Sequence, residues 1–151
     1  MSYPAGKRVA LEMSSAFALL DLVDQVSEQF GQVAGLDEDS VYGLALAVRE
    51  AVINGIKHGN GGDERKRVRV EYGVAHEGAQ ARVVVRVRDE GQGFDPRSVA
   101  DPLAPENLSV ASGRGILIMR SFMDDVRVHR ASEGGTEITM TKAIGPVLPA
   151  G

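Results

Sequence analysis

The segment Val41–Ile56 constrains the fold more than any other part of the sequence, because nearly all of its side chains are apolar or small. Its only strongly polar residues are Arg49, Glu50 and Asn54. Capping residues precede it, and a Gly-Asn-Gly-Gly run from residue 59 ends it, so a helix is predicted. Because apolar side chains occupy opposite faces of this helix, we expect it to be buried nearly all round.

Alternating valines predict a pair of antiparallel strands in the middle of the chain. Apolar residues occupy every second position in Val68–Val74 and again in Val83–Val87, and a turn-like His-Glu-Gly run lies between the two segments. The same alternation over shorter stretches predicts three more strands, near residues 9–13, 126–128 and 138–140.

Two further helices are predicted from periodicity. Apolar residues from Leu19 to Val33 recur at alternating steps of four and three, which is typical of an amphipathic helix packed on a core. The hydroxyls of Ser14 and Ser15 are suited to cap its start. The apolar segment Ile116–Phe122 predicts another helix near the end of the chain.

The stretch between Gly91 and Gly113 is rich in Gly, Pro, Asp, Ser and Asn and is long for a loop in a compact domain. We therefore expect a mobile lid there, over about 95–112. No internal repeat and no second domain is evident, so we expect one domain over 1–151, with its core at about 9–142 and a loose tail at 143–151.

Composition excludes several classes of function. The net charge of −4 and the aromatic content of 5% do not provide the cationic and stacking groups that nucleic-acid binding needs. The absence of cysteine excludes disulfides, thiolate metal sites and thiol catalysis. No apolar run approaches the roughly 20 residues of a membrane-spanning helix, and no apolar signal core follows the first residues, so we expect a cytoplasmic protein.

Asp89 is the first candidate for a binding residue. It keeps the phase of the strand Val83–Val87, which directs its carboxylate to the covered face, where a buried acid needs a partner. Gly91 and Gly93 follow, and glycines allow a flat ligand to approach the backbone closely. An inward carboxylate can select the amino group of adenine. The alternative is a strand that simply ends in an Asp-Gly turn.

Glu50 and Asn54 form the second candidate group, because a spacing of four residues places both heads on one side of the apolar helix. The Asn54 amide oxygen suits a Mg²⁺ ion that also carries phosphate oxygens. A partly desolvated Glu50 suits a general base. Lys57 is a candidate phosphate cation, and His58 lies one turn further along. The alternative is a solvated helix edge with a structural hydrogen bond.

The third candidate group is a glycine-rich sequence that precedes the last predicted helix. Gly113, Arg114 and Gly115 come directly before Ile116, where free backbone N–H groups and the positive end of the helix dipole favour phosphate. Thr136 follows a glycine in the closing strand pair, and its hydroxyl can share contacts to adenine with Asp89. Many helices begin after a glycine without a ligand, and a simple turn is the alternative for Thr136.

Taken in order, four of these segments resemble the conserved boxes of the GHKL superfamily, which unites gyrase, the ninety-kilodalton heat-shock chaperones, histidine kinases and MutL. The boxes are Glu50-Ala-Val-Ile-Asn54, Asp89-x-Gly91-x-Gly93, Gly113-x-Gly115 and Gly135-Thr136. The short format, with Arg49 before Glu50 and Ile-Leu-Ile-Met after Gly115, is most similar to the branch of anti-sigma-factor serine kinases. The likeness extends from about Val9 to Lys142.

The resemblance implies a two-layer α/β sandwich of the Bergerat type, with a mixed, mostly antiparallel sheet and helices on one face. It implies that Glu50 is the base, that Asn54 holds Mg²⁺ and that Asp89 recognises the adenine of ATP. Members of this branch bind a sigma factor and phosphorylate a serine on an anti-anti-sigma protein of the STAS type, and many are homodimers. Ser109–Ser112 departs from the charged pair that well-studied members carry just before the second glycine box.

Other functions fit less of the sequence. A full histidine kinase needs a phosphoacceptor histidine on a dimerising helix, and none of His58, His76 and His129 lies in one, although an isolated catalytic domain stays open. A module in which ATP only shapes a docking surface also stays open, and Glu50 argues against it. A mechanical ATPase of the gyrase or MutL kind would need a transducer domain, for which 151 residues leave no room.

Overall fold

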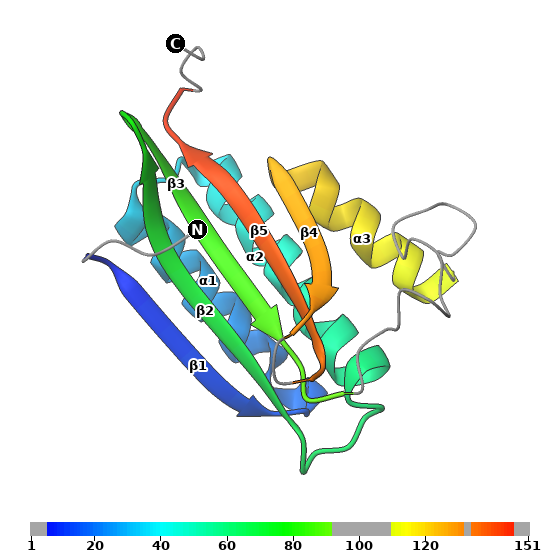
Figure 1. Cartoon of the computed structure of the whole chain (residues 1–151). Coiled ribbons are helices and arrows are strands. Elements are labelled where there is room, and N and C mark those ends of the chain that lie inside the picture. The colour runs from blue at the N-terminus through cyan, green and yellow to red at the C-terminus, as the bar shows by residue number, and fades with distance from the viewer. Residues whose placement is uncertain (1–5, 92–109, 132–133, 147–151) are drawn as a thin grey trace.

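The computed structural model describes residues 6–91, 110–131 and 134–146, and it consists of one sheet with helices packed on one face (Figure 1). The strands are β1 (Arg8–Ser14), β2 (Arg67–Glu77), β3 (Gln80–Arg88), β4 (Asp125–Arg130) and β5 (Thr136–Ile144). The helices are α1 (Leu20–Ala34), α2 (Glu38–Asn54) and α3 (Val110–Phe122). This arrangement confirms the predicted fold class of a two-layer α/β sandwich.

The strands lie in the order β1-β2-β3-β5-β4. Each pairing among the described strands is antiparallel, so the sheet has no parallel pair within these residues. The alternation of valines sets the register, in which Val70 lies opposite Val87 and Tyr72 lies opposite Val85 on the face that the helices cover. This register directs arginines 69, 86 and 88 to the opposite face.

Helix α2 is buried against the sheet on one side and lies between α1 and α3 (Figure 1). Leu44, Val48 and Val52 are fully buried, as the sequence predicts for a helix that is apolar nearly all round. Asp37 caps its start, because the side chain accepts a hydrogen bond from the backbone N–H of Ser40 at 2.7 Å. Tyr42 alone among the large apolar residues of α2 is strongly exposed.

Helix α2 ends in a π-helical turn, Gly55–Gly59, that the sequence did not predict. The backbone N–H of Asn60 donates to the carbonyl of Gly55 at 2.8 Å, which is the wider hydrogen bond of a π turn. The predicted end of the helix near His58 is therefore correct in position, but the last turn is wider than that of an α-helix. Turns of this kind occur often at functional sites.

Three boundaries differ from the sequence-based predictions. Ser14 and Ser15 do not cap α1, which follows a 3-10 turn without a side-chain cap, because the Ser15 hydroxyl donates to the carbonyl of Lys66 at 2.7 Å instead. Strand β5 continues to Ile144 and buries Ala143, so the predicted tail begins later than residue 143. The predicted lid over 95–112 lies mainly outside the described residues, and α3 begins within its end, at Val110.

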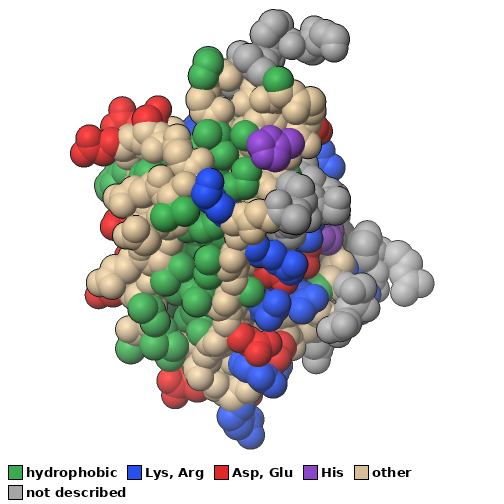
Figure 2. All heavy atoms as spheres, turned by 90° about the vertical axis from the view of Figure 1, so that its left-hand side faces the viewer, with side chains coloured by type: hydrophobic (Ala, Val, Ile, Leu, Met, Phe, Trp, Pro, Cys, Tyr) green, Lys and Arg blue, Asp and Glu red, His purple; other side chains and the backbone are tan. Residues whose placement is uncertain are grey.

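The edge of the sheet at β1 carries exposed apolar side chains. Figure 2 shows hydrophobic side chains exposed on this side of the molecule, and a hollow between β1 and α1 is lined by Val9, Val26, Phe30 and Val33. Val33 is half-exposed although it belongs to the predicted core stripe of α1. Among the described residues, no helix is both long and apolar enough to cross a membrane.

Candidate functional site

Asp89 follows β3 directly and lies in the covered layer, where only 6% of its surface is exposed. Its Oδ1 accepts hydrogen bonds from the backbone N–H groups of Gly91 at 2.9 Å and Thr136 at 3.1 Å. Burial raises the pKa of the Asp89 carboxyl, and the two N–H donors oppose that rise. Among the described residues, none donates a hydrogen bond to Oδ2, which lies against Gly59.

Glycines surround the Asp89 side chain and backbone. A Cβ atom added to Gly59 would lie 2.0 Å from Asp89 Oδ2, and one added to Gly135 would lie 2.1 Å from the Asp89 carbonyl oxygen. A Cβ atom on Gly91 would lie 2.0 Å from the carbonyl oxygen of Gly59. The chain can therefore close around the carboxylate only because these positions have no side chains. Glycine at position 59 lets the Asp89 carboxylate pack directly against the backbone of the turn.

Gly59→Ala is expected to abolish ligand binding at Asp89 and to lower the free energy of unfolding by roughly 1–3 kcal/mol, because the new methyl group overlaps the carboxylate. Gly55→Ala is the matched control in the same turn, since its Cβ would make only ordinary contacts, at 3.5 Å to Val68 and 3.6 Å to Asp89. Titration with ATP and chemical denaturation check both variants. Equal binding by the two variants would contradict the steric account of Gly59.

Glu50 and Asn54 lie on the last turns of α2 and face Gly115 of α3. A Cβ atom on Gly115 would lie 3.3 Å from Glu50 Oε2, 3.4 Å from Asn54 Nδ2 and 3.5 Å from Asn54 Oδ1. The two polar heads thus reach one small volume, as their spacing predicts, and Gly115 leaves that volume free of a side chain. The turn that follows Asn54 contacts Asp89, which places both groups along one end of the helical layer.

The structure changes the predicted position of the third glycine group. Helix α3 begins at Val110, so Gly113 and Gly115 lie inside the helix instead of ahead of it. The free N–H groups at a helix start end with its third residue, so those of Gly113 and Gly115 are not among them. A glycine inside a helix costs only about 1 kcal/mol relative to alanine, and packing of α3 against α2 offsets this cost. Arg114 is exposed on α3.

The remaining predicted residues occupy the edges of this site. Lys57 and His58 are exposed in the π-helical turn, and neither side chain makes a hydrogen bond or ion pair within the described part of the chain. Thr136 joins Asp89 through its backbone, since its carbonyl accepts from Asp89 N at 3.1 Å. Gly93 lies outside the described residues. Sequence reasoning missed Asn60, which is buried beside this site, because a single asparagine in a glycine-rich turn has no periodic signal.

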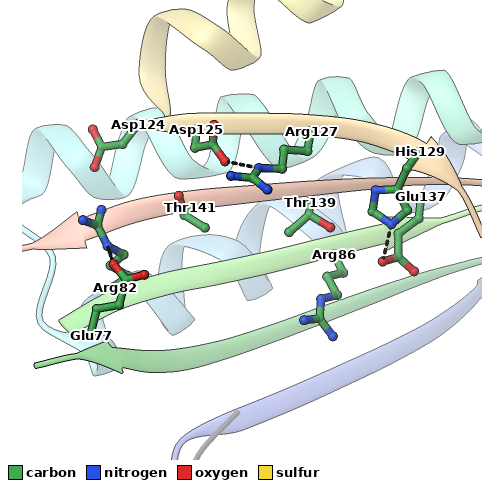
Figure 3. Close-up of a pocket in the computed structure, with 10 residues that line it drawn as sticks. All are labelled: Glu77, Arg82, Arg86, Asp124, Asp125, Arg127, His129, Glu137, Thr139 and Thr141. Atoms are coloured by element: carbon green, nitrogen blue, oxygen red, sulfur yellow. Dashed lines mark hydrogen bonds and ion pairs between the residues drawn. The ribbon is translucent and has the colours of Figure 1, made fainter. Parts of the chain in front are cut away.

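A separate hollow lies on the helix-free face of the sheet and has a different chemistry (Figure 3). Several of the polar side chains that line it lie in pairs across or along the strands. The pairs are Arg82 with Glu77 at 3.4 Å, Arg127 with Asp125 at 2.8 Å and His129 with Glu137 at 3.2 Å. The candidate residues named above do not line this hollow, so we assign the site to the end of the helical layer.

Comparison with known proteins gives a consistent result. The model of the histidine kinase-like ATPase domain family matches residues 13–142. The anti-sigma F factor of Oceanobacillus iheyensis is 33% identical over 143 residues, which are 88% of this chain and 92% of that protein. The serine-protein kinase RsbW of Bacillus subtilis is 32% identical over 114 residues, which are 72% of this chain and 68% of that protein.

Solved structures share the fold at low sequence identity. A crystal structure of the RsbU and RsbW domains of a Mycobacterium tuberculosis protein aligns with a TM-score of 0.64 and 18% identity over 91% of this chain. This chain covers 32% of that larger protein. The mycobacterial sensor histidine kinase MprB aligns with a TM-score of 0.50 and 16% identity over 93% of this chain.

Proposed function

Because the chain belongs to the family of histidine kinase-like ATPase domains, we propose that it is an ATP-dependent protein serine/threonine kinase and anti-sigma factor. The observation that carries the proposal is the arrangement of Glu50 and Asn54 at Gly115, with Asp89 packed among glycines beside the turn that follows Asn54. The names of relatives such as the serine-protein kinase RsbW support the same activity. The experiment that tests it is transfer of the ATP γ-phosphate to a serine or threonine of a partner protein.

Asp89 is proposed to bind the adenine end of ATP. Its Oδ1 is held by two backbone N–H groups, which fixes the carboxylate and leaves Oδ2 to accept a hydrogen bond from the exocyclic amino group of adenine. The backbone carbonyl of Thr136 in β5 also accepts a hydrogen bond from the backbone N–H of Asp89, which helps to fix the position of Asp89. The Thr136 hydroxyl is proposed to add a contact to the base.

Glu50 acts on the substrate hydroxyl at the other end of the site. Its carboxylate accepts the proton of the attacking serine or threonine hydroxyl, whose oxygen forms the new bond to the γ-phosphorus. The bond between the γ-phosphorus and the bridging oxygen breaks, and ADP leaves with that oxygen. Lys57, His58 and Arg114 are proposed to supply positive or hydrogen-bonding groups around the phosphates. Gly113 and Gly115 are proposed to let the phosphates approach α3 closely, because they carry no side chains.

The residues at Gly115 fit a magnesium ion that arrives with ATP. Asn54 offers a neutral amide oxygen beside space that a side chain at position 115 would fill, and hard oxygen ligands are those that Mg²⁺ prefers. Within the described residues, no group of three or more histidine, aspartate or glutamate side chains could hold a metal ion. When bound, Mg²⁺ neutralises charge on the transferring phosphate.

Asn54→Ala is expected to weaken ATP binding in the presence of Mg²⁺ by at least about tenfold, while binding measured in EDTA changes little, because the lost oxygen is proposed to touch the ion. Isothermal titration with and without Mg²⁺ measures both affinities. An equal loss under the two conditions would assign Asn54 a structural role instead of a ligand role.

The proposed protein partners are a sigma factor, which the chain sequesters, and an anti-anti-sigma protein of the STAS type, which it phosphorylates. We place this exchange in the cytoplasm. The name of the Oceanobacillus iheyensis relative supports the anti-sigma role. A homodimer is proposed as the working form, and the exposed apolar edge formed by β1 and α1 supports it, because such surfaces commonly mark protein contacts (Figure 2).

A further inference from the structure

Asn60 is a buried side chain whose polar atoms are all engaged, although it lies between two exposed stretches of a glycine-rich turn. Only 3% of its surface is exposed. Its Nδ2 donates to Ser15 Oγ at 2.7 Å and to the Arg67 carbonyl at 3.0 Å, and its Oδ1 accepts from the backbone N–H of Glu90 at 2.8 Å. One amide thus joins the segment after β1, the start of β2 and the segment after β3.

The backbone of the same residue closes the π-helical turn. Asn60 N donates to the Gly55 carbonyl at 2.8 Å, and the Asn60 carbonyl accepts from Asp63 N at 3.1 Å. Only an uncharged side chain with two donors and one acceptor at this length completes the set without leaving a buried polar group unpaired. The arrangement therefore requires asparagine specifically, and not merely a polar residue in a turn.

Both sides of the contact between Asp89 and Gly59 depend on this residue. Its main chain holds the turn that places Gly59 against Asp89 Oδ2, and its side chain holds the N–H of Glu90, the residue directly after Asp89. The Glu90 carboxylate is fixed in turn by the backbone N–H of Arg67 at 2.9 Å. We infer that Asn60 is a positioning residue for base recognition, which sets the place of the Asp89 carboxylate against Gly59.

This inference rests on the proposed role of Asp89 as the residue that accepts a hydrogen bond from adenine. It predicts an effect on base preference, which a loss of fold stability alone would not produce. A suitable pair of probes is ATP and purine riboside triphosphate, which lacks only the 6-amino group. Because both probes carry the same triphosphate, the ratio of their dissociation constants isolates recognition of that amino group.

Asn60→Ala is expected to reduce the preference for ATP over purine riboside triphosphate by about tenfold, the size of one well-placed hydrogen bond. Ser15→Ala is the matched control, because it removes one partner of the Asn60 amide on the side away from Asp89 and leaves the bond to Glu90 intact. This control is expected to lower thermal stability while keeping the wild-type preference. Asn60→Asp retains the acceptor for Glu90 N–H and is expected to restore part of the preference.

Isothermal titration of the full chain with each nucleotide, in parallel with thermal unfolding, separates the outcomes. A wild-type preference in Asn60→Ala would overturn the inference. If the wild type shows no preference, or if Asp89→Asn leaves the preference unchanged, the proposed recognition of adenine by Asp89 is rejected, and the inference about Asn60 falls with it. If Asn60→Ala does not fold, Asn60→Ser takes its place, because its hydroxyl is too short to reach Glu90 N–H. An unchanged preference in that variant would likewise overturn the inference.

Discussion

Asp89→Asn is expected to weaken ATP binding by about a hundredfold and to leave the fold intact. The carboxylate is proposed to accept a hydrogen bond from adenine, and an amide nitrogen facing that donor cannot accept it, so the loss of a charge-assisted bond is joined by a mismatch. The amide oxygen can still accept from Gly91 and Thr136, because one acceptor atom serves both donors in the wild type. Titration with ATP measures the affinity, and denaturant unfolding measures the fold.

The pH dependence of the same pair of proteins provides an independent check. Burial raises the pKa of the Asp89 carboxyl above its ordinary value. The protonated form is therefore favoured by folding, and its contribution to stability is present below the unfolded pKa and lost as pH rises through the raised folded pKa. The free energy of unfolding of Asp89→Asn should lack this contribution to the pH dependence. ATP binding by the wild type should weaken as pH falls through the same range, because a protonated carboxyl is a poorer acceptor.

Near-wild-type affinity of Asp89→Asn for ATP would show that Asp89 does not recognise adenine. A suitable control is Asp125→Asn, which alters a carboxylate that pairs with Arg127 at 2.8 Å on the helix-free face of the sheet. Loss of binding in both variants would indicate a general effect of charge and not a specific contact.

Glu50→Gln is expected to slow phosphate transfer by roughly 10²–10⁴-fold at matched ATP occupancy, because the amide cannot accept the proton of the attacking hydroxyl. Binding of Mg²⁺-ATP and of the sigma factor should remain near wild type, since the side chain keeps its size beside Gly115. In cells the variant should act as a locked inhibitor that holds its sigma factor. Transfer rates under single-turnover conditions, with pull-down of the sigma factor, check both expectations.

A control for Glu50→Gln is Glu64→Gln, an exposed carboxylate in the loop after the π-helical turn. Its transfer rate should equal that of the wild type. Equal rates for Glu50→Gln and the wild type would reject Glu50 as the base, even if the chain proves to be a kinase.

Local patterns in the sequence were sufficient to predict the layers of the fold. The alternation in Val68–Val74 and Val83–Val87 predicted the central strand pair, which the structure confirms as β2 and β3. The apolar segment after Asp37 predicted helix α2 and the cap at its start. The spacing of Glu50 and Asn54 predicted that their side chains lie on the same side of the helix, because residues four apart are neighbours on a helix surface. These features depend on neighbours within a few residues along the chain.

Features that depend on distant partners could not be predicted. The Ser15 hydroxyl was expected to cap α1, but it bonds to Lys66 and Asn60, which lie 51 and 45 residues away. The start of α3 was placed after Gly115, and the structure begins it at Val110 because packing against α2 outweighs the weak helix propensity of glycine. The roles of Gly59 and Asn60 also arise only where the turn meets Asp89.

We expect this chain to transfer the γ-phosphate of ATP to a protein hydroxyl. The most direct test mixes the wild-type chain, γ-labelled Mg²⁺-ATP and the anti-anti-sigma protein encoded nearest to its gene, and follows the label over a single turnover. The expected result is acid-stable label on a serine or threonine of that partner. Acid-labile label on histidine, or release of the label only as inorganic phosphate, would contradict it.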